Sequence, residues 1–152
     1  GGARLGWGVS DSSSVPPGFR PVPSTGFADA NGPWFEKIEG DRLIRGFLPG
    51  PQHSNTHGIV HGGMLAAFLD SVMGSTVFHV LHRRCVTVRL SIDYLLPGRV
   101  GVWLQGEAEV LGHDEQMVQV RGRLYGPRHD VLAGLGAFAL LHRQRVPKII
   151  RS

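Results

Sequence analysis

Cysteine is almost absent from this chain, because Cys85 is the single cysteine among 152 residues. One cysteine excludes a disulfide bond within the chain, and such usage is typical of the reducing cytoplasm, where we expect the protein to be located. A nucleophilic thiol needs an activating neighbour, whereas Cys85 begins a segment in which apolar and polar residues alternate. We therefore expect Cys85 to be a structural residue of a β-strand.

Long apolar runs and blocks of basic residues are also missing. We find no apolar run of the length that spans a membrane, and the N-terminal residues lack the basic region and apolar stretch of a signal peptide. The 16 Lys and Arg exceed the 12 Asp and Glu by four, but the arginines are spread along the chain. We therefore expect neither a membrane nor a nucleic acid as partner, whereas single arginines can still bind the phosphates of a small molecule.

Three motifs of other enzyme classes are absent as well. The chain has no G-x-S-x-G sequence, which would place a serine nucleophile on a strand–helix turn. It has no G-x-G-x-x-G sequence after a strand and no Walker-type phosphate loop. These absences argue against a serine hydrolase of that type, a dinucleotide-dependent oxidoreductase and a nucleotide hydrolase. We expect no cofactor.

Proline, glycine and serine are frequent in residues 1–33, which show no sustained apolar period. This composition predicts a flexible or extended N-terminal extension. Residues 34–143 are expected to form one domain, which is long enough to bury an apolar core. Residues 144–152 are expected to be a basic C-terminal tail.

One long helix and about five strands are predicted in that domain. Residues 62–82 are apolar on nearly all sides of the first two turns, which predicts a buried helix. Strands are predicted near residues 42–48, 86–94, 102–110, 118–124 and 131–141, the last of them apolar on both faces as in a central strand. Short turns between the last four predict an antiparallel meander. The fold class is therefore α+β, with an antiparallel sheet curled around one helix.

Residues 55–63, which read N-T-H-G-I-V-H-G-G, are the most informative segment. Gly62 and Gly63 lie where the long helix is expected to begin, and the first N–H groups of a helix have no partner within it. These groups carry partial positive charge, so they could hold a carbonyl oxygen as negative charge develops on it. Alternatively, the two glycines only allow close packing of the helix on the sheet.

Asp70 is a lone carboxylate in an apolar stretch of the same helix. A carboxylate is costly to bury among apolar side chains, and the loss of hydration makes it a better proton acceptor. Hydrogen bonds to Ser71, Ser75 or a loop would be the structural alternative. We favour a functional carboxylate because no basic residue lies within two turns of it on the helix.

The spacing of Gly62 and Asp70 predicts how the site is assembled. Eight residues separate them, which corresponds to about 12 Å along a helix that rises 1.5 Å per residue. A donor and a carboxylate that far apart cannot flank the same carbonyl carbon. Two antiparallel copies of the helix could provide such a pair, so we expect two sites at the two-fold interface of a dimer.

Four other side chains are weaker candidates. His57 and His61 have the i, i+4 spacing of a helical metal site, but Gly58 argues against a helix there and no third ligand is evident, so we expect no metal. Asn55 is interpreted as a residue that orients a loop or a bound water, or as a simple turn residue. Thr87 is ordinary in a strand.

These residues resemble a known family. The spacing from Asn55 through Gly58 and His61 to Asp70, with the strand that leads to Pro97, resembles the hotdog-fold acyl-CoA thioesterases of the PaaI-like group over roughly residues 43–142. The resemblance implies a hotdog fold, in which an antiparallel sheet wraps around a central helix. It also implies an acyl-CoA substrate and a homodimer, which in this family is often half of a homotetramer.

The same resemblance implies a role for each candidate residue. Asp70 would be the general base or the nucleophile that acts on the thioester, and the Gly62 N–H would polarise the thioester carbonyl. His61 and Asn55 would position the loop, the thiolate leaving group or the water. Thr87 falls where the family often has a Ser or Thr that helps to place the water.

We therefore expect an acyl-CoA thioesterase that releases a free carboxylic acid and coenzyme A, with Gly63 among the residues that contact coenzyme A. Two alternatives remain open, a module that binds acyl-CoA without turnover and an enoyl-CoA hydratase or dehydratase. The intact Asp70 argues against the former, and the lack of a differently spaced Asp–His pair argues against the latter. The acyl group is open, because the apolar residues of the helix suit a pocket or a core: these are Met64, Phe68, Met73 and Phe78.

Overall fold

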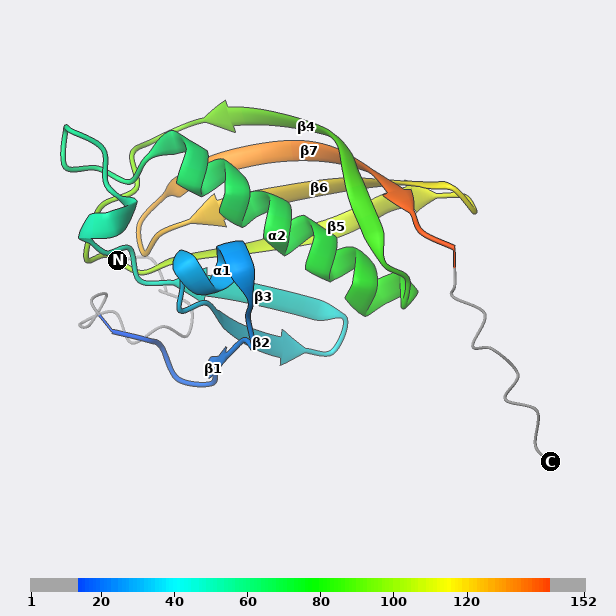
Figure 1. Cartoon of the computed structure of the whole chain (residues 1–152), viewed down its shortest axis with the longest axis horizontal. Helices are drawn as coiled ribbons and strands as arrows, with labels where there is room; N and C mark the ends of the chain where they lie inside the picture. The colour runs from blue at the N-terminus through cyan, green and yellow to red at the C-terminus, as the bar shows by residue number, and fades with distance from the viewer. Residues whose placement is uncertain (1–13, 143–152) are drawn as a thin grey trace.

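The computed structural model describes residues 14–142, which form a curved antiparallel sheet with one long helix in its concave face (Figure 1). The elements, in chain order, are β1 Arg20–Pro21, α1 Gly26–Ala30, β2 Phe35–Glu39, β3 Arg42–Phe47, the 3₁₀ turn η1 Pro51–His53, α2 Gly62–Leu81, β4 Cys85–Tyr94, β5 Leu104–His113, β6 Met117–Tyr125 and β7 Asp130–Leu140. The predicted fold class and the predicted long helix are confirmed.

The sheet has seven strands rather than about five, in the order β1-β2-β3-β5-β6-β7-β4. The two additional strands are β1 and β2. β2 pairs with β3 over its whole length, although the sequence pattern predicted no strand at these residues. The backbone hydrogen bonds of β3 therefore determine the conformation of β2 more than its own short apolar pattern does.

Part of the range 1–33 packs on the sheet. β1 pairs with β2, and the ring of Phe19 packs edge-on against that of Trp103, with 5.1 Å between the ring centroids. These contacts compensate the entropy cost of ordering a segment rich in proline and glycine. Residues 1–13 and the basic tail at 144–152 lie outside the described residues, and the predicted domain limits stay predictions.

The predicted meander holds only for β5, β6 and β7. β4 pairs with β7, so it lies at the far edge of the sheet instead of beside β5. The connection between β4 and β5, residues 95–103, is longer than a hairpin turn and carries the chain across the end of the sheet. β7 consequently has a neighbour on each side, as its apolar character predicted.

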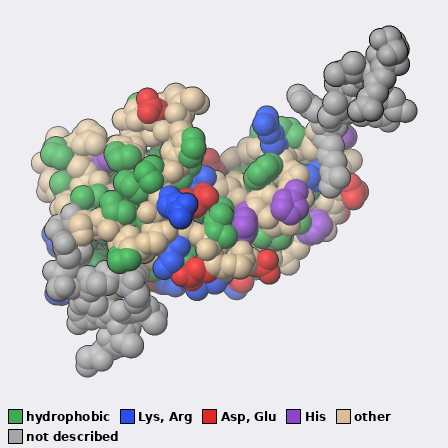
Figure 2. Space-filling view, turned by 90° about the horizontal axis from the view of Figure 1, so that it is seen from below, with side chains coloured by type: hydrophobic (Ala, Val, Ile, Leu, Met, Phe, Trp, Pro, Cys, Tyr) green, Lys and Arg blue, Asp and Glu red, His purple; other side chains and the backbone are tan. Residues whose placement is uncertain are grey.

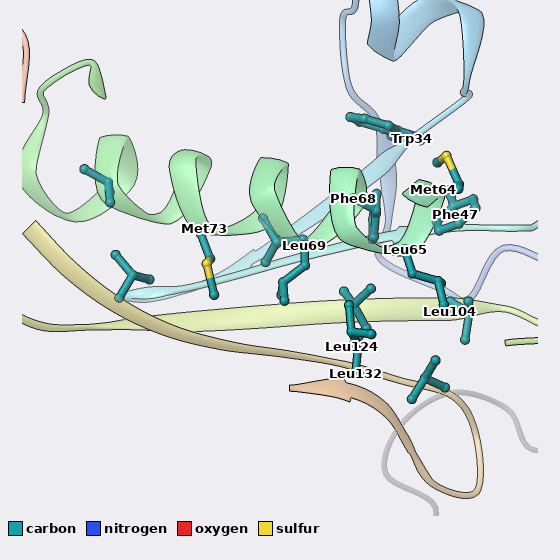
Figure 3. Close-up of a cluster of buried hydrophobic side chains, with 14 of the residues drawn as sticks. Trp34, Phe47, Met64, Leu65, Phe68, Leu69, Met73, Leu104, Leu124 and Leu132 are labelled. Atoms are coloured by element: carbon teal, nitrogen blue, oxygen red, sulfur yellow. The ribbon is translucent and has the colours of Figure 1, made fainter. Parts of the chain in front are cut away.

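One side of α2 forms the core with the sheet, and the other side does not. The buried residues of α2 are Met64, Leu65, Phe68, Leu69, Val72, Met73, Thr76 and Val77. Figure 3 shows Leu65, Leu69 and Met73 pointing toward the strands that carry Leu104 and Leu124, and Phe68 lying beside Phe47 of β3. Met64, Phe68 and Met73 therefore belong to the core. The expected burial on all sides is wrong for this chain, because the sheet covers only one face of the helix.

Within the described residues, α2 also has the length and hydropathy of a membrane-spanning helix, with 20 residues and a mean hydropathy of 1.5. The sequence-based expectation that no run reaches this length does not hold for α2. The core helix of a folded domain meets the same criterion, since a helix packed in a sheet is as apolar as one packed in lipid. The packing of α2 on the sheet accounts for its composition.

Candidate active site

The start of α2 presents an unused backbone donor. His61 is the N-cap residue, and its Nδ1 accepts a hydrogen bond from the Gly63 N–H at 2.8 Å. The carbonyl of His61 accepts from Met64 and Leu65. Within the described part of the chain, the N–H of Gly62 donates to no acceptor. The free N–H is therefore that of Gly62, at the positive end of the helix dipole, whereas the N–H of Gly63 is occupied.

The ring of His61 is oriented by the same hydrogen bond. Because Nδ1 accepts from Gly63, a neutral His61 carries its proton on Nε2, which leaves that nitrogen as a donor. The main chain of His61 is held as well, since its N–H donates to the carbonyl of His53 at 2.7 Å. His61 thus fixes the first turn of α2 and presents an N–H group to solvent.

Asp70 and Thr87 are brought together from two elements. The hydroxyl of Thr87 in β4 donates to Oδ1 of Asp70 in α2 at 2.6 Å. Asp70 is half-buried and not buried as the sequence suggested, because the buried stripe of α2 lies on the opposite side of the helix. The carboxylate also affects Cys85. The pKa of the Cys85 thiol is raised mainly by burial and, to a smaller extent, by the negative charge of Asp70.

A β-bulge in β4 makes the Thr87 contact possible. The pairing of β4 with β7 shifts register between Thr87 and Arg89, so one residue is inserted into the alternation of faces. Strict alternation would place Thr87 and Tyr94 on opposite faces of the strand. With the bulge, both side chains reach α2. The sequence pattern alone did not reveal this shift.

Tyr94 is a residue that the sequence interpretation missed. Its hydroxyl donates to the carbonyl of Gly62 at 2.8 Å, and a Cβ at Gly62 would lie only 3.2 Å from Cε1 of the ring. The tyrosine therefore packs on the glycine and holds the peptide group between Gly62 and Gly63, next to the free N–H of Gly62. Tyr94 is 56% exposed and is followed by the exposed Leu95 and Leu96. Such a run of large apolar residues at a strand end was the signal available in the sequence.

Asn55 shapes the loop before α2. Its side-chain oxygen accepts hydrogen bonds from the N–H groups of His57 at 2.8 Å and Ile59 at 3.4 Å. Gly58 in the same loop has a φ of +75°, a conformation that favours glycine. These contacts support the interpretation of Asn55 as a turn residue.

His57 is exposed, and within residues 14–142 no three His, Cys, Asp or Glu side chains are placed to hold a metal ion together.

The site residues form two groups at two places on α2. The first group contains Gly62 with His61 and Tyr94, and the second contains Asp70 with Thr87. α2 is continuous between Gly62 and Asp70, so the two are about 12 Å apart along its axis. No hydrogen bond joins the two groups within the described chain. One such group is a positioned donor of the oxyanion-hole type, and the other is a positioned carboxylate.

Comparisons with known proteins give a consistent result. The sequence profile of the thioesterase superfamily matches residues 57–133. A candidate esterase of Pseudomonas aeruginosa is 30% identical over 131 residues, which are 84% of this chain and 98% of that protein. A Bacillus halodurans protein whose crystal structure was solved with coenzyme A has 29% identity and a TM-score of 0.69, over 80% of this chain and 82% of that one.

A further structural relative shares the fold. A candidate thioesterase from Ralstonia eutropha JMP134, related to phenylacetic acid degradation, has a TM-score of 0.69 at 24% identity. The match covers 78% of this chain and 92% of the other. The matched profile range of residues 57–133 includes both groups of site residues, but not Asn55.

Proposed function

This chain belongs to the thioesterase superfamily, and we propose that it hydrolyses an acyl-CoA to a free carboxylic acid and coenzyme A. One observation carries the proposal: β4 contacts α2 both at the residue with the free N–H donor and at the carboxylate. Tyr94 binds the carbonyl of Gly62, and Thr87 binds Asp70. A donor for a developing oxyanion and a carboxylate base or nucleophile are what thioester hydrolysis requires. The structure of a relative with coenzyme A supports this substrate class.

The proposed reaction begins with the thioester carbonyl oxygen at the Gly62 N–H. Asp70 either removes a proton from water, which attacks the carbonyl carbon, or attacks that carbon itself to form an anhydride that water then opens. Negative charge on the carbonyl oxygen is stabilised by the N–H and by the positive end of the helix. In the water route, the carbon–sulfur bond breaks after the attack of water; in the anhydride route, it breaks as the anhydride forms, before water opens the anhydride. In both routes the thiolate of coenzyme A leaves. Neither route needs a cofactor.

We further propose that each site is shared by two subunits of a homodimer, because Gly62 and Asp70 of one chain are too far apart. The free edge of β4 supports this. β4 is ten residues long, pairs with no strand other than β7 among residues 14–142, and exposes 49% of Val86 and 60% of Val88. A long apolar edge strand is a ready partner for another strand. Pairing of β4 with β4 of a second copy would bring the two α2 helices together, and a tetramer of two such dimers is compatible with it.

The test of the function is thiol release from a panel of acyl-CoA esters, from acetyl to dodecanoyl and including an aromatic acyl group. We expect turnover of at least one ester by the purified protein, with activity that falls when the protein is diluted below the dimer dissociation constant. Saturable binding of every ester without turnover would instead indicate a binding module. Loss of enoyl absorbance without thiol release would indicate a hydratase.

We also propose that the protein is located in the cytoplasm, as its single cysteine suggests.

Thr87 provides a prediction about positioning. Replacing Thr87 with valine keeps the shape and strand preference of the side chain but removes the hydroxyl that holds Asp70. A hydrogen bond to a charged group contributes about 1.5–3 kcal/mol, so we expect kcat to fall about 10-fold or more, with KM changed little. Thr87→Ser should recover most of the rate in the same thiol-release assay. Equal kcat for wild type and Thr87→Val would show that the hydroxyl does not position the carboxylate.

A further inference from the structure

A groove of about 800 Å³ follows the C-terminal half of α2. Its walls come from α2, from the hairpin of β2 and β3, and from the start of β4. Leu43 forms a buried part of the lining. Ile38 and Phe78 are each 53% exposed and Leu141 is 42% exposed, and all three border the groove. Large exposed apolar side chains gathered around one hollow indicate a binding surface.

The groove comes close to Asp70 along both α2 and β4. Gly74, which lines the groove, is one helical turn beyond Asp70. Cys85 also lines the groove and lies two residues before Thr87, the partner of Asp70. Arg45 of β3, which also lines the groove, donates a hydrogen bond to the hydroxyl of Ser71, the residue after Asp70, at 2.9 Å. The proposed carboxylate is therefore one helical turn from the groove lining.

The end of the groove farther from Asp70 is polar. His79, His82 and Arg84 line it, and the side chains of His82 and Arg84 make no hydrogen bond or ion pair with any described residue. Figure 2, viewed from the side of β2 and β3, shows histidines beside hydrophobic side chains on this face. From Gly74 to His82 the helix rises about 12 Å. Glu36 and Arg45, which form an ion pair, line the groove on the side of β2 and β3. The apolar surface of the groove thus has a limited length, and a longer apolar ligand would meet polar groups.

Gly74 is a glycine that packing does not explain. A Cβ added there would come no closer than 4.0 Å to Sγ of Cys85 and to Cε1 of Phe138. By contrast, a Cβ at Gly134 or Gly136 would come within 2.8 Å or less of a side chain. Glycine is a poor helix former, so its presence in the middle of α2 costs stability. What the absent side chain leaves is free space at the end of the groove next to Asp70.

We propose that this groove holds the acyl group of the thioester, that the preferred acyl group is a medium-length or aromatic apolar one, and that Gly74 sets the size it can have. This proposal rests on the proposed function. The carbonyl end of the substrate would be at Asp70, and the acyl chain would run over Gly74 toward Phe78. Long fatty acyl chains would be poor substrates because they would reach His82 and Arg84.

The experiment compares kcat/KM over the acyl-CoA panel for wild type, Gly74→Leu and Phe78→Ala. Gly74→Leu fills the near end of the groove, and a single methylene too many in an apolar pocket costs about 10–200-fold. We expect a loss of about 30-fold or more for octanoyl-CoA, with acetyl-CoA changed less than about 3-fold. Phe78→Ala, which opens the groove, should shift the preference toward bulkier acyl groups. Val80→Leu, on the same stretch of helix but outside the groove, is the matched control.

Failure of the proposed function and failure of the groove proposal give different results. If wild type hydrolyses none of the esters, the proposed function itself fails. If wild type is active but Gly74→Leu lowers all esters by the same factor, the groove is not the acyl site. Gly74→Ala should unfold at a slightly higher temperature than wild type, because alanine favours the helix. If Gly74→Ala or Gly74→Leu instead dissociates the oligomer in sedimentation velocity, a second copy of the chain fills the groove and the proposal is overturned.

Discussion

Replacing Gly62 with proline is expected to lower kcat about 10²–10³-fold while the chain still folds, as when an oxyanion-hole donor is removed. Gly62 is the first residue of α2, a position where proline is well tolerated because its missing N–H has no helical partner. The preceding His61 has a ψ of 132°, which is the extended conformation that a following proline requires. The substitution therefore removes one donor and little else. Thiol release and the thermal unfolding midpoint are the two measurements.

Gly62→Ala is the matched control. It adds a Cβ at the same place, 3.2 Å from Cε1 of Tyr94, but it keeps the N–H. The tyrosine ring must move by a few tenths of an ångström in both variants. We expect Gly62→Ala to retain most of the activity and Gly62→Pro to lose it. If both variants lose activity equally, crowding at Tyr94 is the cause, and the N–H has no catalytic role.

Replacing Asp70 with asparagine is expected to lower kcat by about 10²–10⁴-fold, the contribution typical of a positioned general base. Asparagine keeps the shape of the side chain, and its amide oxygen can still accept the hydrogen bond from Thr87. It can neither accept a proton from water nor attack the thioester. Asp93→Asn is the control, because Asp93 is an exposed carboxylate of the neighbouring strand β4. Equal rates for wild type and Asp70→Asn would remove Asp70 from the mechanism.

The two inactive variants together test the shared site. In a mixed dimer of Gly62→Pro and Asp70→Asn chains, one site contains both substitutions and the other contains an intact Gly62 and an intact Asp70. With random pairing, half of the dimers are mixed and each restores one of two sites, so about a quarter of the wild-type activity should return. Co-refolding the two chains and measuring thiol release provides the answer. No recovery, despite mixed dimers seen by differential tagging, would place both groups in one subunit.

Much of the fold could be predicted because the long helix and several strands are determined by local residue patterns. The apolar run that became α2 and the alternation that became β5 and β6 depend on residues near one another in the chain. The order of the sheet could not be predicted in this way. Both β4 and β5 have strand character, and only the pairing of β4 with β7 decides that β4 lies at the edge. β2 was missed for the same reason, since its conformation depends on β3.

The candidate site shows the same division. The glycine pair and Asp70 were visible as exceptions to the local pattern, a glycine at a helix start and a charge in an apolar stretch. The apolar run that contains Tyr94 was visible, but the role of Tyr94 was not, because that role depends on contact with Gly62 across the fold. The expected burial of Asp70 was wrong for the single chain, because the sequence shows that a helix is apolar but not which side the sheet will cover.

The sequence by itself determined the residue types that can do the chemistry and their separation along one helix, because the helical rise converts eight residues into a length. It therefore also determined the prediction that one chain cannot complete a site. Only the tertiary structure decided which backbone N–H is free, which side chains hold Gly62 and Asp70, and where a groove begins. The physical reason is that a bulge in β4 and the pairing of distant strands direct Thr87 and Tyr94 to the same helix, and such long-range contacts leave no periodic trace in the sequence.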